Sequence, residues 1–443
     1  MKEGEFVIMW EPQYEKMPRG ELEDLQLERL KQKVRYVYER VPFYRAKFRE
    51  LGVTPQDIRL LDDVTRLPFT SKDDVRNNYP YGLMAVPLSE VVRVHASSGT
   101  TGKPIVVPYN ANDIDVWANL MARSLATAGV ESTDVMQNVY GYGLFTGGLG
   151  FHYGGERLGV TVIPASVGNT KRQVMLIEDL GTTVLACTPS YIFVLAGVAQ
   201  EMGVDLTSTG LRLAMCGAEP WTEGMRVEIE ARAGLAAIDF YGLTELIGPG
   251  VSCECQYQNG LHIWEDHFLA EIVDPETGQP LPYGKQGELV LTTLSKEAMP
   301  MIRFRTHDLV TLYPEVCRCG RTMVRMSKVH GRTDDMLIVR GVNIFPTQVE
   351  SVLLSVEGIA PHYQIIVDRE HHLDDIEVWG EITDAAFSDD RLVLKELEDR
   401  VRKEMNSVLG ISARIKLVEP GTINRTVGKV RRVIDRRELW SSS

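Results

Sequence analysis

The chain has 443 residues, of which 44% are hydrophobic and 25% are charged, as is ordinary for a globular enzyme of two or three domains. Its 61 acidic and 48 basic residues give a net charge of −13, which argues against a general binder of nucleic acid or of an anionic membrane. No apolar run is long enough for a signal segment or a membrane span, so we expect a cytoplasmic protein.

The first element expected in the chain is a helix. Residues 22–41 carry Leu and Val side chains at steps of mostly three and four, which predicts an amphipathic helix that stops at Pro42. From there to about residue 255, short apolar runs that end in Gly or Pro alternate with helical segments. This alternation predicts an α/β fold with a large N-terminal domain of mainly parallel sheets.

The pattern changes after about residue 255. Residues 267–294 have the pattern of strands joined by turns, which predicts a small β-rich subdomain within the N-terminal domain. Near the C-terminus, Pro346 begins a helix that Gly358 ends, and strands and a second amphipathic helix follow. This last part predicts a small, separate α+β domain with its own core.

The loop HASSGTTGKP, residues 95–104, combines hydroxyl groups, glycines and one lysine. It is not a P-loop, because Ser97 stands where that motif needs Gly and Pro104 stands where it needs Ser or Thr. It is not the kinase G-x-G-x-x-G loop either. Hydroxyl groups and flexible Gly N–H groups nevertheless suit phosphates. The alternative for the loop alone is a polar turn between two strands.

Five further stretches follow in order: CGAEPW (216–221), DFYGLTE (239–245), RFRTHDL (303–309), GRTDDMLIVRGVNIFP (331–346) and NRTVGKVRR (424–432). Their order and spacing resemble the adenylate-forming acyl- and aryl-CoA synthetase superfamily. The resemblance is closest to the phenylacetate–CoA ligase family, and YGYGLFTGGLGFHYG (140–154) and HIWEDHF (262–268) are similar to that family's own versions. It covers nearly the whole chain. It implies a ligase that uses ATP, Mg²⁺ and coenzyme A to convert a small aryl carboxylate to an aryl-adenylate and then to an aryl-CoA thioester.

The resemblance also implies an ATP site. The residues expected to hold the β- and γ-phosphates are Ser97, Ser98, Gly99, Thr100, Thr101, Gly102 and Lys103. Those expected around the adenine are Gly217, Ala218, Glu219, Asp239, Phe240, Tyr241 and Gly242. Asp308 would accept the ribose hydroxyls, and Arg332 would contact ribose or phosphate. His307 stands where the superfamily often has Gly, and it either reaches the ligand or fills space.

Catalysis must bring two anions together, so it needs charge neutralisation and alignment. Thr244 would donate its hydroxyl to the α-phosphate, and Glu245 is a hard oxygen ligand suited to Mg²⁺. The catalytic lysine that the resemblance implies is Lys429, which would bridge the carboxylate and the α-phosphate. Lys103 would then be an accessory cation, and the alternative for Lys429 is one of several cations in a basic tail.

The resemblance implies that the C-terminal domain moves between the two half-reactions about a hinge at Asp334, with Asp335 as a weaker candidate. We therefore expect an adenylate-forming domain over residues 1–333 and a mobile lid domain over residues 334–443 that carries the catalytic lysine. Tyr140 and Phe145 would line an aryl pocket, whereas Tyr142 fits core packing equally well. The sequence is also compatible with a homodimer.

Six cysteines include two Cys-x-Cys pairs, which predict a structural zinc site rather than disulfides. The expected ligands are Cys255, His262, Cys317 and Cys319, with Cys253 as the competitor of Cys255. The site would lie in a subdomain over about residues 250–330. The alternative is free cysteines near the surface.

Two other functions remain as alternatives. An enzyme of the same superfamily could stop at the AMP adduct or use an acceptor other than CoA. A non-catalytic nucleotide-binding protein could share the scaffold, although Thr244, Glu245, Asp308 and Lys429 together argue against it.

Overall fold

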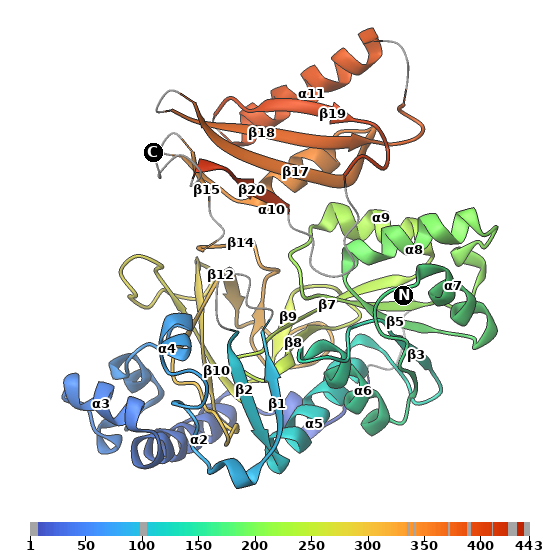
Figure 1. Cartoon of the computed structure of the whole chain (residues 1–443). Coiled ribbons are helices and arrows are strands. Elements are labelled where there is room, and N and C mark those ends of the chain that lie inside the picture. The colour runs from blue at the N-terminus through green and yellow to red at the C-terminus, as the bar shows by residue number, and fades with distance from the viewer. Residues whose placement is uncertain are drawn as a thin grey trace.

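One mixed sheet of twelve strands organises the N-terminal part of the computed structural model, and a four-stranded sheet organises the C-terminal part (Figure 1). The structure describes residues 8–97, 104–334, 337–339, 342–370, 373–387, 391–409, 411–423 and 432–437. The expected α/β fold, with a large N-terminal domain and a small C-terminal domain, is confirmed. Among the described residues, no helix is long and apolar enough to cross a membrane.

Five of the twelve strands of the large sheet are parallel, as predicted. They are β3 (Val135–Asn138), β4 (Thr161–Ile163), β5 (Val184–Cys187), β6 (Leu213–Cys216) and β7 (Ala236–Leu243). The helices between them are α6 (Gly147–Leu158), α7 (Thr170–Asp179), α8 (Pro189–Glu201) and α9 (Glu223–Ala233), and α5 (Ala111–Ala128) precedes β3.

The parallel strands carry one hydrophobic core on each face. Along β5, Val184 and Ala186 belong to the core that includes α5, whereas Leu185 and Cys187 belong to the core of α7, α8 and α9. Strand β6 alternates in the same way. Because both of their faces are buried, β5 and β6 contain no polar residues, which explains why they were recognisable as short apolar runs.

The β-rich region continues the same sheet instead of forming a sheet of its own. Its strands are β8 (Gly248–Glu254), β9 (Leu261–Ile263), β10 (Phe268–Val273), β11 (Gln286–Thr293), β12 (Phe304–Tyr313), β13 (Arg325–Met326) and β14 (Gly331–Arg332). They are antiparallel, and β8 pairs directly with the last parallel strand, β7. The expected subdomain is therefore the antiparallel half of one sheet.

The N-terminal residues form helices beside this sheet: α1 (Pro12–Glu15), α2 (Arg19–Arg40), α3 (Pro42–Glu50), α4 (Lys72–Asn77) and the 3-10 helices Pro55–Asp57, Leu61–Arg66 and Leu88–Glu90. A further 3-10 helix, Leu206–Ser208, lies between α8 and β6. Helix α2 ends as expected, because Val41 precedes a proline and has an extended backbone. Pro42 also begins α3, where its missing N–H costs nothing. The hairpin of β1 (Val91–Ala96) and β2 (Val106–Asn110) flanks the Gly-rich loop.

The C-terminal elements are β15 (Leu337–Val339), β16 (Val342–Ile344), α10 (Pro346–Ser355), β17 (Ile359–Glu370), β18 (Leu373–Ile382), α11 (Arg391–Leu409), β19 (Arg414–Val418) and β20 (Val433–Asp435). Strands β15 and β16 form a hairpin, and the other four form a sheet in the order β19-β18-β17-β20. These elements share a core separate from the two cores of the large sheet. Figure 1 shows this unit next to the large sheet, with α10 near α9.

Candidate functional site

A cavity lies at the carboxyl ends of β6 and β7, the edge at which open α/β sheets bind their ligands. It gathers residues from four of the sequence stretches. The residues that line it and that the sequence assigned to ATP are Ala218, Glu219, Asp239, Phe240, Tyr241, Gly242, Asp308 and Arg332. The structure thus brings together positions more than 100 residues apart, although their binding roles stay predictions.

The backbone at the floor of this cavity is constrained. Ala218 has φ of 68°, a left-handed conformation that is rare for a residue with a side chain and that concentrates at functional sites. A side-chain carbon on Gly217 would lie 2.6 Å from the carbonyl oxygen of Phe240. The turn after β6 therefore requires Gly at 217, and β7 packs directly against it.

Asp308 is held from two sides. The hydroxyl of Tyr241 donates to Oδ2 at 2.6 Å, and Nη1 of Arg332 donates to Oδ1 at 2.5 Å. Burial raises the pKa of Asp308, while the charge of Arg332 and the Tyr241 hydrogen bond oppose that rise. A buried carboxylate with oriented oxygens is suited to accept hydroxyl groups, as the sequence interpretation requires.

A second buried acid, Asp239, also lines the cavity. Burial, and then the nearby Glu254 carboxylate, raises its pKa to about 7. Glu254 is itself bound by Nη2 of Arg226, at 2.9 and 2.8 Å from its two carboxylate oxygens. Asp239 is thus held within a buried charge cluster at the end of β7.

Thr244 and Glu245 follow β7 directly and are both buried. Lys296, a buried cation that the sequence did not single out, lies next to this segment. Nζ of Lys296 donates to the carbonyl of Leu246 at 2.6 Å and lies 4.5 Å from the ring centroid of Tyr109. Burial lowers the pKa of Lys296 to about 8, while the charges of Asp113 and Glu245 oppose that shift. No sequence pattern distinguishes this lysine from an exposed one.

Two further cavity residues were also missed. Nζ of Lys328 lies 3.7 Å from the ring centroid of Trp221 and 2.8 Å from Oε1 of Glu223. Both Lys328 and Trp221 line the cavity. Trp221 ends the CGAEPW stretch, so its position was a signal that could have been used.

Several predicted residues lie outside the part of the chain that the structure describes. They are Ser98, Gly99, Thr100, Thr101, Gly102, Lys103 and Lys429, together with Asp335. Ser97 is described, and its hydroxyl accepts a hydrogen bond from the Ile105 N–H at 3.1 Å. This bond closes the base of the loop between β1 and β2.

The two predicted acyl-pocket residues lie on either side of Gly147. A side-chain carbon there would be 3.2 Å from Tyr140 and 3.3 Å from Phe145. The Tyr140 ring stacks on Phe151 with centroids 5.4 Å apart, and its hydroxyl donates to the Cys187 carbonyl at 2.5 Å. Tyr140 is thus rigid, whereas Phe145 is 39% exposed. Tyr142 is half-buried and belongs to none of the hydrophobic cores of the described residues, and its hydroxyl accepts a hydrogen bond from the buried Asn138 amide at 2.9 Å and lies 3.3 Å from Nδ1 of His152.

The region of the predicted hinge is tied to the cavity. Asp334 pairs with Nε of Arg332 at 2.8 Å and with Nζ of Lys72 at 3.6 Å. Burial would raise the pKa of Asp334, but the hydrogen bond and charge of Arg332 keep it below the usual value. His307 adopts φ of 65°, which explains why Gly suits this position, and its Nδ1 lies 2.9 Å from the Thr333 hydroxyl.

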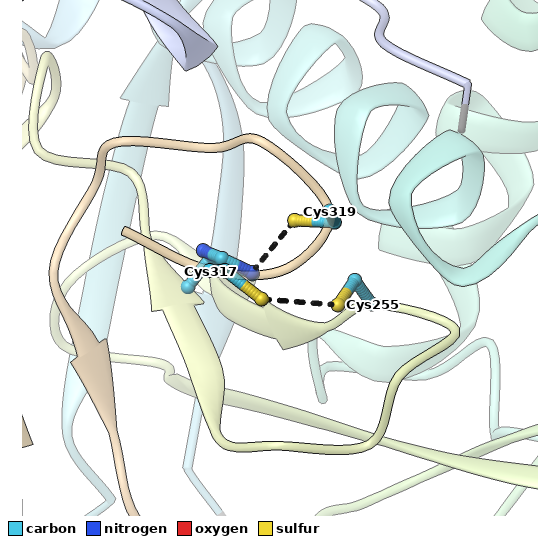
Figure 2. Close-up of side chains that lie close together, drawn as sticks. Cys255, Cys317 and Cys319 are labelled. Atoms are coloured by element: carbon cyan, nitrogen blue, oxygen red, sulfur yellow. Dashed lines mark hydrogen bonds between the residues drawn. The ribbon is translucent and has the colours of Figure 1, made fainter. Parts of the chain in front are cut away.

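A separate cluster joins Cys255, His262, Cys317 and Cys319, whose candidate ligand atoms all lie within 4.8 Å of one another. Figure 2 shows the three thiols facing one another, with Sγ of Cys255 and Cys317 3.8 Å apart. Sγ of Cys319 is 3.4 Å from Nε2 of His262. Cys253 points away, because its thiol donates to the Ser124 carbonyl at 3.5 Å. Of the two competing cysteines, the structure brings Cys255 to the cluster.

Two spacings in the cluster, 3.8 Å between Sγ of Cys255 and Cys317 and 3.4 Å between Sγ of Cys319 and Nε2 of His262, match those of a tetrahedral zinc site. Bond lengths of about 2.3 Å to sulfur and about 2.0 Å to nitrogen place ligands about 3.8 Å (S to S) and about 3.5 Å (S to N) apart. Hydrogen bonds within the cluster lower the pKa of Cys319 and raise the pKa of Cys255. The turn is closed by Gly320, which has φ of 85° and whose N–H donates to the Cys317 carbonyl at 2.8 Å.

Both parts of the chain match known protein families. Residues 47–295 match the family of AMP-binding enzymes, and residues 341–437 match the AMP-binding enzyme C-terminal domain. A phenylacetate–coenzyme A ligase of Thermus thermophilus is 52% identical over 97% of this chain and 100% of that protein. One of Aromatoleum evansii is 50% identical over 96% of each.

Among solved structures, 2-hydroxyisobutyryl-CoA ligase in the postadenylation state, in complex with R3-HIB-AMP, is 29% identical and has a TM-score of 0.92 over 99% of this chain and 94% of that chain. The same ligase in the thioesterification state, with 2-HIB-AMP and CoA, has a TM-score of only 0.72 at 31% identity over 97% and 92%. Since identity and coverage hardly differ, the parts of this chain are arranged more as in the first state. On these matches, the chain belongs to the phenylacetate–coenzyme A ligase family of AMP-binding enzymes.

Proposed function

We propose that this protein is an AMP-forming ligase that joins a small aryl carboxylic acid, such as phenylacetate, to coenzyme A. In the first step the carboxylate attacks the α-phosphorus of ATP, so that an aryl-adenylate forms and pyrophosphate leaves. In the second step the CoA thiol attacks the acyl carbon, the thioester forms, and AMP leaves. The observation that carries the proposal is the cavity in which Asp308, Tyr241 and Ala218 meet in a chain about half identical to phenylacetate–coenzyme A ligases.

In this proposal the cavity residues orient the nucleotide. Asp308 accepts the ribose hydroxyls, and Arg332, which already neutralises Asp308, contacts ribose or phosphate. The segments at 217–219 and 239–242 form the wall for adenine. The loop at 97–103 holds the β- and γ-phosphates, which depart as pyrophosphate. Fixed groups of this kind act by alignment and by charge neutralisation, the two needs of a reaction between anions.

Thr244 donates its hydroxyl to the α-phosphate, and Glu245 beside it fits Mg²⁺, since a buried carboxylate is a hard oxygen ligand. Mg²⁺ supplies charge neutralisation on the phosphates when bound. Lys429 bridges the carboxylate and the α-phosphate as charge develops, and Lys103 is an accessory cation. We therefore expect Lys429→Ala to abolish adenylate formation and to leave thiolysis of a supplied adenylate largely intact. A greater loss of adenylation in Lys103→Ala than in Lys429→Ala would reverse this ranking.

The two steps need different surroundings, and we propose that residues 334–443 rotate as a lid about Asp334 between them. The two states of 2-hydroxyisobutyryl-CoA ligase support this proposal, because one of them resembles the present arrangement much more than the other does. Asp334→Pro is expected to slow thioester formation far more than adenylation, since it fixes one backbone angle of the hinge. Unchanged thioester production would remove the hinge from the proposal.

The aryl class rests on Tyr140 and Phe145, whose rings can cover a planar acid. We further propose that the four-residue cluster holds a structural Zn²⁺. The four side chains would occupy every coordination position of the ion and leave none for a substrate. A homodimer and a cytoplasmic location also stay predictions, which light scattering and cell fractionation would test.

The deciding experiment measures pyrophosphate release from ATP with a panel of aryl acids, with and without CoA. Acid-dependent pyrophosphate release together with a CoA-dependent thioester is the expected result. Acid-dependent release without any thioester would favour the relative that stops at the AMP adduct or uses another acceptor. Nucleotide binding with no release for any acid would favour a non-catalytic nucleotide-binding protein.

A further inference from the structure

The C-terminal unit contacts the N-terminal domain through α10 and β17. Leu354 of α10 packs against the core of α7, α8 and α9, and its Cβ would be 3.4 Å from a side-chain carbon placed on Gly224. The ring of His362 meets that of Phe193 edge to face, with centroids 6.1 Å apart. These apolar contacts bring the two units together but carry little directional information.

Arg432 is a charged residue at this contact. Its carbonyl oxygen accepts a hydrogen bond from the Ile365 N–H at 2.7 Å, at the point where the chain enters β20. Its guanidinium hydrogen-bonds to Oε2 of Glu350 and lies 4.5 Å from the Tyr363 ring centroid. On the other side, Nη2 is 4.0 Å from Sδ of Met225 in α9. One side chain therefore reaches from the C-terminal sheet to the N-terminal domain.

The charge of Arg432 is paired within the C-terminal unit by the carboxylate of Glu350 in α10, which fixes the direction of the Arg432 side chain. The Glu350 side chain is 2% exposed, and Oε2 also accepts from the Tyr363 hydroxyl at 3.0 Å. Its other oxygen is buried and has no hydrogen-bond partner among the residues that the structure describes. Burial lowers the pKa of Arg432, and the charge of Glu219, a residue of the cavity wall, opposes that shift. A buried ion pair of this kind is expensive to break and fixes one geometry.

We propose that Arg432 and Glu350 are positioning residues that anchor the C-terminal unit against the wall of the ATP cavity in the adenylate-forming arrangement. The proposal rests on the function proposed above. Arg432 is three residues from Lys429 in the sequence, and three residues span at most about 11 Å. An anchor at Arg432 therefore limits how far Lys429 can be from the contact between the units. The anchor has no function in thioester formation, for which the lid must leave this arrangement.

The test uses a double variant, Arg432→Gln/Glu350→Gln, because removal of only one partner would leave a buried charge unpaired. Two half-reactions are measured with phenylacetate as the acid: ATP–pyrophosphate exchange for adenylation, and thioester formation from supplied phenylacetyl-adenylate and CoA. We expect pyrophosphate exchange to fall about tenfold or more, because only the fraction of molecules with the lid in place can react. Thioester formation should stay the same or rise.

The matched control is Arg436→Gln, which removes a cation of the same tail that is exposed and faces Asp368 within the C-terminal unit. It should leave both half-reactions unchanged. Unchanged pyrophosphate exchange in the double variant would overturn the anchor, and so would an equal loss of both half-reactions, which indicates a general structural defect. If the wild type shows no exchange with any acid, the proposed function fails instead.

A measurement that does not depend on enzyme activity distinguishes failure of the anchor from failure of the proposed function. Amide hydrogen exchange in α9, which Arg432 contacts through Met225, is compared between the wild type and the double variant. The anchor predicts faster exchange in α9 of the double variant and no change in the Arg436→Gln control. Equal protection of α9 in wild type and double variant would contradict the anchor whatever the chemistry.

Discussion

The hydroxyl of Tyr241 donates a hydrogen bond of 2.6 Å to Oδ2 of Asp308 and so connects the end of β7 to β12. Because Arg332 occupies the other oxygen, the carboxylate of Asp308 has one fixed orientation in the cavity. The substitution Tyr241→Phe removes only the hydroxyl oxygen that maintains this orientation of the carboxylate. We expect KM for ATP to rise about tenfold, the effect of losing one hydrogen bond to a charged group, with a smaller change in kcat.

Tyr313→Phe is the control for this change, since Tyr313 is the last residue of β12 and does not line the cavity. It should leave KM for ATP unaltered. If Tyr241→Phe also left KM for ATP unaltered, Asp308 would not be the group that binds ribose.

Gly147→Ala tests the acyl pocket. The added methyl group would lie 3.2 Å from Tyr140 and 3.3 Å from Phe145, closer than ordinary van der Waals contact. Because Tyr140 is fixed by its stacking on Phe151 and by its hydrogen bond to Cys187, the methyl group takes space from the acid. We expect KM for phenylacetate to rise about tenfold, as for one carbon too many in an apolar pocket, with KM for ATP unchanged.

Gly143→Ala is the matched control in the same segment, because a side-chain carbon there would have no neighbour within 4 Å. Equal kinetics for the two variants would place the acid elsewhere. A rise in KM for ATP in Gly147→Ala would mean that Tyr140 acts mainly on the nearby turn at Gly217.

The sequence was sufficient to predict the parallel part of the sheet, because strands that are buried on both faces appear as apolar runs between helices. It was not sufficient for the antiparallel half. The pairing of β8 with β7 depends on contacts such as Phe240 with Cys253, which no local pattern reveals. The region therefore looked like a separate subdomain, although it extends the same sheet.

The same limit applies to the candidate site. Gly217 and Asp308 belong to short stretches whose order is informative, so they could be placed together before any coordinates were known. Lys296 has no such signal, since a lysine between a serine and a glutamate is usually exposed, and only the fold shows that its ammonium reaches the Leu246 carbonyl. Similarly, Cys253 and Cys255 became distinguishable only when β8 turned one thiol toward Ser124.

The cysteine cluster predicts the metal content of the purified protein. About one zinc per chain is expected by elemental analysis, because four ligands close a tetrahedral site. Cys319→Ser should lose the metal and lower the melting temperature, since binding energy at such a site is also folding energy.

Cys253→Ser serves as the control for Cys319→Ser, because Cys253 is equally buried but faces away from the cluster. It should keep the full zinc content. Metal well below one equivalent per chain in the wild type, from cells grown with added zinc, would refute the site.

Lys296 predicts a dependence of stability on pH. Burial lowers its pKa to about 8, from an ordinary value of 10.5 in the unfolded chain. Between these values the unfolded state binds more protons than the folded state, so this group makes the free energy of unfolding rise with pH. Below pH 8 the ammonium is charged in both states, and the full cost of burying it is present. The stability of the wild type relative to Lys296→Met should therefore increase from about pH 8 to pH 10.

Urea unfolding at both pH values measures the difference, and Lys285→Met is the control because the Lys285 side chain is exposed. A wild-type advantage that stays flat or falls over this range would show that the Lys296 ammonium is not desolvated.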